Sequence, residues 1–234
     1  YNLNRRNNDL KLYEFGKTYH KYQKYTEKKN LMLLASGRKQ IENWNNNNNL
    51  VDLFWLKEQI EHVLIRLGIN GFKLQKADLE YLINGHNYYV NKKVVATFGC
   101  VNKNLCQKFD VKKEVLYANF EWDQILELFQ LSKTQYQPIS KFQAARRDLA
   151  LLIDKKIEFS TLKSLAKDCE KKLLKKVNLF DVYEGEKIPK GKKSYALSFI
   201  LQNEHKTMTD QEIEKVMSKL IKVFEEKAGA EIRM

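Results

Sequence analysis

The sequence predicts an α+β fold with antiparallel sheets, in two parts joined by a polar stretch. Three observations predict it. Short apolar runs alternate with turn residues through the first 120 residues, two helical stripes follow beyond residue 158, and strand-like runs flank those stripes. With 234 residues and 43% hydrophobic content, the chain can bury a core in one or two domains.

The first predicted elements are strands. Residues 10–19, LKLYEFGKTY, form a strand-like run that Gly16 is expected to end, and residues 31–36 form a second extended stretch. We expect these two stretches to pair in antiparallel fashion. The five asparagines at 45–49 favour neither helix nor strand, so they predict an exposed loop tip.

A helix is predicted over residues 51–67, because apolar residues recur near helical period and Gly68 follows them. It is expected to lie against a sheet. Residues 81–120 alternate short apolar runs with Asn, Lys and Gly, which is typical of antiparallel strands joined by tight turns. Residues 122–129 predict a short helix. The polar stretch 133–139 predicts a linker between domains at 1–132 and 140–234.

Beyond the linker the elements follow the order strand, helix, strand, strand, helix, strand. Thr209 and Glu212 have the spacing of a capping box at the start of the second helix, and Gly229 is expected to end that helix. Strands are predicted at 149–153, 176–183, 194–201 and 230–234, with the first helix at 159–173. This order is the ferredoxin-like βαββαβ arrangement, in which both helices cover one sheet face and the other stays open.

Charge and cysteine content narrow the functional classes. The formal net charge of +13 suits a polyanionic partner such as nucleic acid. The charge is spread, however, since residues 133–234 hold 22 basic and 15 acidic side chains and the remainder holds 20 and 14. A Lys-rich surface that is simply exposed to solvent explains the net charge equally well. Three cysteines without a CxxC pair argue against a disulfide framework and a zinc site, and they favour a reducing cytoplasm.

The chain has no apolar run long enough to cross a bilayer and no signal-peptide pattern. It starts at Tyr1 rather than at a methionine, so we expect it to be part of a longer gene product.

Three segments carry a resemblance to a known family. They are SKFQAARRDLALLID at 140–154, LFDVYEGEKIPKGKKSYALSFILQ at 179–202 and TMTDQEIEKVMSKL at 207–220. In this order and spacing they resemble the ferredoxin-fold anticodon-binding domain of the bacterial phenylalanine-tRNA ligase β subunit family. One position departs from the family pattern, because Gln143 follows Phe142 where the family usually has a proline.

The upstream half resembles the preceding domain of the same family. Its matching segments are NLNRRNNDLKLYEFGKTY at 2–19 and VDLFWLKEQIEHVLIRLGI at 51–69, whereas a His-Pro-Gly-Arg segment common in the family is replaced by INGHNYYVNK at 83–92. In the family this domain is a noncatalytic relative of the class II synthetase fold. The resemblance therefore implies a class II synthetase-like antiparallel sheet domain followed by the ferredoxin-like domain.

No catalytic site is expected in this chain. Forming an aminoacyl adenylate requires a clamp for the ATP phosphates, and the sequence has no P-loop, no dinucleotide fingerprint and no Gly-rich segment ending in Arg. Glu14 lies where class II relatives place a functional Glu, but residues 15–19 contain no arginine, so we interpret Glu14 as a structural strand residue. Neither Cys169 nor any histidine has a catalytic partner at motif spacing; the histidines are His20, His62, His86 and His205.

Anticodon recognition needs cations for phosphates, hydrogen-bonding groups for base edges and aromatic faces for unstacked bases. The resemblance and this chemistry together select eight candidate tRNA-binding residues: Phe142, Arg146, Arg147, Asp181, Tyr183, Ser194, Tyr195 and Arg233. Core packing is the alternative for Phe142 and Tyr195, because Tyr195 alternates with apolar residues that share one strand face. For Asp181 the alternative is a turn brace or a partner for an arginine.

The resemblance implies a noncatalytic part of a β subunit whose holoenzyme, an (αβ)₂ heterotetramer, uses ATP and Mg²⁺ to attach phenylalanine to its tRNA. The α subunit would carry the active site, and no cofactor is expected in this chain. Residues 1–132 would act as scaffold, and residues 140–234 would read the anticodon. Two alternatives stay open: an autonomous enzyme in residues 1–132, which the absent ATP clamp argues against, and a structural or protein-interaction module without RNA binding.

Overall fold

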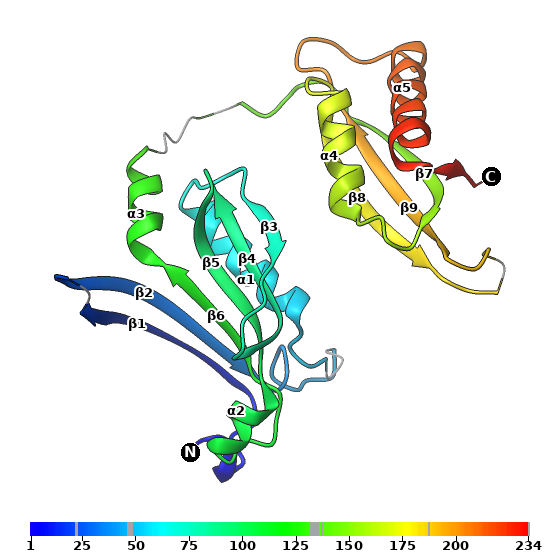
Figure 1. Cartoon of the computed structure of the whole chain (residues 1–234). Coiled ribbons are helices and arrows are strands. Elements are labelled where there is room, and N and C mark those ends of the chain that lie inside the picture. Colours follow the sequence, from blue (N-terminus) through cyan, green and yellow to red (C-terminus); the bar gives the residue numbers. More distant parts are fainter. Residues whose placement is uncertain (22, 46–48, 132–135, 137, 187, 234) are drawn as a thin grey trace. The chain divides into compact units, whose positions relative to one another are not determined.

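The computed structural model describes the whole chain except residues 22, 46–48, 132–135, 137, 187 and 234 (Figure 1). The contacts divide the chain into two compact units, Tyr1–Tyr136 and Gln137–Met234. Each unit has its own antiparallel sheet and its own hydrophobic core, so the predicted α+β class is confirmed. Much of the predicted linker and the middle of the asparagine run lie outside the described residues. Among the described helices, none is long and apolar enough to cross a membrane.

The sheet of the first unit has six strands in the order β1-β2-β6-β5-β4-β3, with every neighbouring pair antiparallel. The strands are β1 Leu10–Lys21, β2 Tyr25–Ser36, β3 Lys73–Lys76, β4 Leu82–Val90, β5 Lys93–Val101 and β6 Leu116–Glu121. The prediction that Gly16 ends the first strand is wrong, because β1 continues through it. Gly16 pairs with Asn30 of β2, and this cross-strand pairing outweighs the low strand propensity of glycine.

Helices pack on one face of this sheet. In α1, Leu53–Arg66, the buried side chains of Leu56, Ile60 and Leu64 join the core, which confirms the predicted amphipathic helix. The Asp52 carboxylate caps α1 by accepting the backbone N–H of Trp55. The short helix predicted after β6 is confirmed as α3, Trp122–Leu131. The sequence interpretation missed α2, Lys103–Lys108, since six residues are too few to show a helical period.

The second unit has a four-stranded antiparallel sheet in the order β10-β7-β9-β8. Its strands are β7 Ala145–Asp154, β8 Leu174–Tyr183, β9 Lys192–Leu201 and β10 Glu231–Ile232, and its helices are α4 Phe159–Cys169 and α5 Asp210–Ala228. Along the chain the order is β7-α4-β8-β9-α5-β10. Chain order and strand order together confirm the ferredoxin-like prediction.

Both helices of the second unit lie on the same side of its sheet (Figure 1). Leu162 of α4 and Phe224 of α5 are fully buried in one core with Leu151 and Leu197 of the central strands. The predicted capping box opens α5, and Gly229 ends it in the left-handed conformation with φ 54°. The opposite face of the sheet carries neither of these helices.

Candidate nucleic-acid interface

Strand alternation defines which side chains lie on the uncovered face of the four-stranded sheet. On β7, Leu149, Leu151 and Ile153 point into the core, so the residues between them point away from both helices. Cross-strand pairing extends this assignment to the other strands. The term open face denotes the residues that result: Arg146, Asp148, Ala150, Leu152 and Asp154 on β7, Lys176, Asn178, Asp181 and Tyr183 on β8, Lys192, Ser194, Ala196, Ser198 and Ile200 on β9 and Glu231 on β10, together with Phe180 and Arg233, which contact them.

Two arginine–aromatic pairs lie on the open face. The guanidinium carbon of Arg146 is 5.4 Å from the centre of the Phe180 ring, and that of Arg233 is 5.5 Å from the centre of the Tyr183 ring. Both rings remain accessible, since Phe180 is 49% and Tyr183 39% exposed. Exposed aromatic rings beside cationic groups are what unstacked RNA bases and their phosphates require.

A second contact orients Arg146. Its Nε and Nη2 donate to the two carboxylate oxygens of Asp148 at 2.8 and 3.1 Å. This bidentate pair raises the pKa of Arg146 and holds its guanidinium plane near Phe180. Both partners are solvent-exposed, so the pair itself stabilises the fold little. Arg146 is therefore positioned in advance while its charge stays accessible to an RNA phosphate.

The structure brings five of the eight candidates together on the open face: Arg146, Asp181, Tyr183, Ser194 and Arg233. They come from β7, β8, β9 and the residue after β10, so the fold assembles them from the whole length of the unit. Asp181 is exposed beside Phe180, whereas Ser194 lies on a central strand and is only 5% exposed. The open face thus combines two arginines, two lysines (Lys176 and Lys192), two aromatic rings and groups able to hydrogen-bond base edges.

The other three candidates lie elsewhere in the second unit. Arg147 points to the helix side, where its Nη2 donates to the carboxylate of Asp210 at 3.2 Å, at the start of α5. Tyr195 is a core residue, only 8% exposed, as its alternation pattern indicated. Phe142 is half-buried ahead of β7, and its carbonyl accepts a hydrogen bond from the side chain of Gln202 at 2.7 Å.

The sequence interpretation missed Phe180. A β-bulge in β8 between Leu179 and Asp181 shifts the register there. Phe180 and Asp181 therefore both lie on the open face, whereas regular alternation would place them on opposite faces. The signal was present in the sequence. Leu179 and Phe180 are adjacent large apolar residues that interrupt the period-2 pattern of β8, and such a break indicates a bulge.

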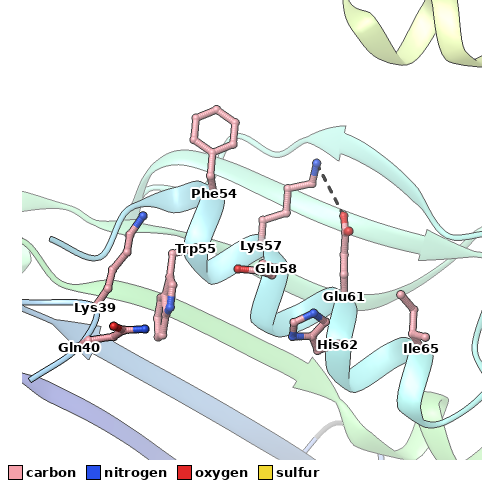
Figure 2. Close-up of a pocket in the computed structure, with 9 residues that line it drawn as sticks. All are labelled: Lys39, Gln40, Phe54, Trp55, Lys57, Glu58, Glu61, His62 and Ile65. Atoms are coloured by element: carbon pink, nitrogen blue, oxygen red, sulfur yellow. Dashed lines mark ion pairs between the residues drawn. The ribbon is translucent and has the colours of Figure 1, made fainter. Parts of the chain in front are cut away.

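A pocket of about 730 Å³ lies along α1 of the first unit (Figure 2). Its two lysines both face carboxylates, because Lys39 pairs with Asp52 at 2.7 Å and Lys57 with Glu61 at 3.7 Å. Its lining comprises Lys39, Gln40, Phe54, Trp55, Lys57, Glu58, Glu61, His62 and Ile65. Among the described residues, the lining of this pocket contains no arginine. The described part of the chain also has no cluster of His, Cys, Asp or Glu that could hold a metal.

Comparison with family models matches both units. Residues 140–233 match the family described as "Ferredoxin-fold anticodon binding domain". Residues 1–122 match "Phenylalanyl tRNA synthetase beta chain CLM domain", which is more than half of the chain.

Curated relatives match along the chain. The phenylalanine–tRNA ligase β subunit of Bacteroides fragilis is 41% identical over 246 residues, covering 100% of this chain and 30% of the relative. The same subunit of Porphyromonas gingivalis is 36% identical with the same coverage, and that of Fusobacterium nucleatum is 31% identical over 99% of this chain and 30% of its own length. The chain thus spans about 30% of the length of the curated relatives it matches.

Solved structures show a more distant likeness. Pyrrolysyl-tRNA synthetase from Desulfitobacterium hafniense is 15% identical and aligns over 53% of this chain and 42% of its own, with a TM-score of 0.39. A second structure of that enzyme covers 56% of this chain and 47% of its own at 16% identity, with a TM-score of 0.40.

Proposed function

Since the chain belongs to the phenylalanyl-tRNA synthetase β chain family, we propose that it is the C-terminal part of a phenylalanine–tRNA ligase β subunit and that its second unit binds the anticodon of phenylalanine tRNA. The observation that carries this proposal is the open face, where Arg146 and Arg233 lie over the exposed rings of Phe180 and Tyr183. A face built only for solubility would not need exposed aromatic rings.

The open face supplies each interaction that anticodon binding needs. Unstacked bases rest on the rings of Phe180 and Tyr183, and the guanidinium groups of Arg146 and Arg233 contact the phosphates that follow the bases. The Asp181 carboxylate accepts hydrogen bonds from base edges. Ser194 lies within this surface on the central strand, and Arg147, Phe142 and Tyr195 support it from the helix side, the preceding loop and the core.

In this proposal the chain divides into a scaffold at 1–132, a linker at 133–139 and the anticodon-binding domain at 140–234. All four strands and both helices of the ferredoxin-like core fall within the last span. The isolated span 140–234 should therefore melt cooperatively, as followed by circular dichroism. A spectrum without secondary structure would overturn the proposed boundaries.

The proposed holoenzyme is an (αβ)₂ heterotetramer in the cytoplasm that attaches phenylalanine to its tRNA. ATP, with Mg²⁺ on its phosphates, activates the amino acid in the α subunit, while this part of the β subunit binds the anticodon and scaffolds the assembly.

Direct binding tests the proposal. Fluorescence anisotropy should show that the chain binds phenylalanine tRNA more tightly than the same tRNA with its anticodon bases replaced. Affinity for both should fall as salt is raised, because phosphate contacts release counterions. Equal affinity for the two tRNAs would exclude anticodon reading, and no binding of either would favour the interaction-module alternative.

A further inference from the structure

A second pocket of the first unit lies on the sheet face opposite α1 and α3. Its volume is about 430 Å³, and β1, β2 and β6 supply its lining. Leu31 of β2 and Phe120 of β6 point into the core, so the alternating neighbours Asn30 and Glu121 point to the other face and line this pocket. The volume falls within the range of roughly 300–1,000 Å³ typical of small-molecule sites.

Gly16 creates the floor of this pocket. Strand pairing places Gly16, Asn30 and Glu121 in one row across the three strands, with Glu14 and Asn119 in the next row. Because Gly16 has no side chain, it leaves a depression between Glu14 and Thr18, which flank it on the same face of β1. A Cβ added at Gly16 would meet only the Oε1 of Glu14 at 3.7 Å within a 4 Å radius, which is ordinary contact distance.

Amide groups hold one carboxylate of the wall in place. The Nδ2 of Asn119 donates to the Oε1 of Glu121 and to the Oδ1 of Asn30, each at 3.2 Å. Neither Glu14 nor Glu121 forms an ion pair among the described residues. The pocket therefore presents two carboxylates with capacity to accept further hydrogen bonds.

An aromatic wall adjoins these carboxylates. The rings of Tyr117 and Tyr81 meet edge to face at 6.0 Å. Tyr117, Asn119 and Glu121 alternate along β6, so the Tyr117 ring and the Glu121 carboxylate lie on the same sheet face and both line the pocket. Burial raises the pKa of both tyrosines, and the charge of Glu121 contributes to the same direction of shift. A carboxylate beside an aromatic face is the environment that attracts an organic cation.

We propose that this pocket binds a small molecule through a primary ammonium group, held between Glu14 and Glu121 beside the ring of Tyr117. The ammonium supplies three donors, which match the free acceptor capacity of the two carboxylates. Lys28 lines the pocket one row beyond Gly16, so a second positive charge at that end is disfavoured. The ligand class is thus a monoamine or an amino acid rather than a diamine, and its assignment rests on residues of the first unit alone.

Three matched probes test the ligand class on the full 234-residue chain by isothermal titration calorimetry. Propylamine is a cation, β-alanine a zwitterion and propionate an anion of similar size. Propylamine and β-alanine should bind saturably and propionate should not. No saturable binding of either amine, or equal binding of propionate, would overturn the proposal.

Variants test the location of the site. Glu121→Gln and Glu14→Gln should each weaken amine binding about tenfold, because each loses a charged acceptor. Gly16→Val should fill the floor and abolish binding while the chain keeps or raises its Tm, since valine favours a strand. Tyr117→Phe should keep the affinity and Tyr117→Leu should lose most of it. The control is Glu58→Gln on α1, which lies outside this pocket and should leave the affinity for the amine unchanged. If every pocket variant folds and binds the amine with unchanged affinity, the amine binds elsewhere and the proposal is wrong.

Discussion

The guanidinium of Arg233 lies 5.5 Å from the centre of the Tyr183 ring, and this contact joins the two edges of the four-stranded sheet. Arg233 follows the edge strand β10, whereas Tyr183 ends the opposite edge strand β8. The backbone N–H of Arg233 donates to the carbonyl of Ala150 on β7 at 2.9 Å, which aligns the end of the chain along the sheet. The last strand therefore completes the open face.

Replacing Phe180 with alanine should weaken tRNA binding while leaving the fold intact. One base-stacking platform is worth about 1–3 kcal/mol, and Phe180 is half exposed, so its removal costs the core little. Anisotropy would measure the affinity and thermal unfolding the Tm. Val182→Ala is the matched control, because Val182 is equally exposed at 49% but faces the helix side, paired with Tyr195. Equal affinities for the two variants would remove Phe180 from the interface.

Replacing Arg146 and replacing Arg147 with alanine should have different effects on the salt dependence of tRNA binding, although the two residues are adjacent in the sequence. Arg146→Ala removes a cation from the open face, so the slope of log affinity against log salt should fall by about one unit. Arg147→Ala should change that slope less, because its guanidinium is held by Asp210 on the helix side. Both variants should keep their Tm nearly unchanged, since the ion pairs they break are exposed. The opposite order of slope changes would place the RNA on the helix side.

Tyr88→Phe should destabilise the first unit by about 1.5 kcal/mol, the contribution of a hydrogen bond to a charged group. The Tyr88 hydroxyl donates to the Glu61 carboxylate at 2.5 Å and ties β4 to α1. Tyr88 is 1% exposed, and burial, followed by the hydrogen bond to Glu61, raises its pKa. Urea unfolding would measure the loss, with Tyr13→Phe, 74% exposed, as control. A loss no larger than in the control would show that the bond contributes nothing net.

The Cys100 thiol should make the first unit sensitive to alkali. Burial, and then its hydrogen bond to Glu114 at 3.2 Å, raises the pKa of Cys100 from 9.0 to about 12. Above pH 9 the unfolded chain therefore releases this proton more readily than the folded chain, and stability falls as pH rises towards 12.

Comparing variants isolates this effect of Cys100. The free energy of unfolding of Cys100→Ala, measured in urea from pH 8 to about pH 10.5, should decline less steeply than that of the unaltered chain. Val95→Ala is the control, because Val95 is buried on the same strand and has no titratable group. Parallel pH profiles for the Cys100 variant and the unaltered chain would contradict the raised pKa.

Local signals predicted the elements well where each signal was complete within one element. The Thr209–Glu212 capping box, the stripe of α5 and Gly229 lie within about 20 residues, and the structure has all three as predicted. Gly16 misled the prediction, because its low strand propensity is a local property whereas its pairing with Asn30 is not. The six residues of α2 were too short for any periodic signal.

The sequence alone determined the order of elements in the ferredoxin-like unit, the apolar stripes that form its core and the family to which the chain belongs, because these depend on periodicity and motif spacing along the chain. Only the tertiary structure decided which candidates meet. Arg146 and Arg147 lie on different sides, and Phe180 joins the open face through a bulge. Strand register and bulges are set by pairing between distant segments, so the composition of a sheet face follows from contacts that no local pattern contains.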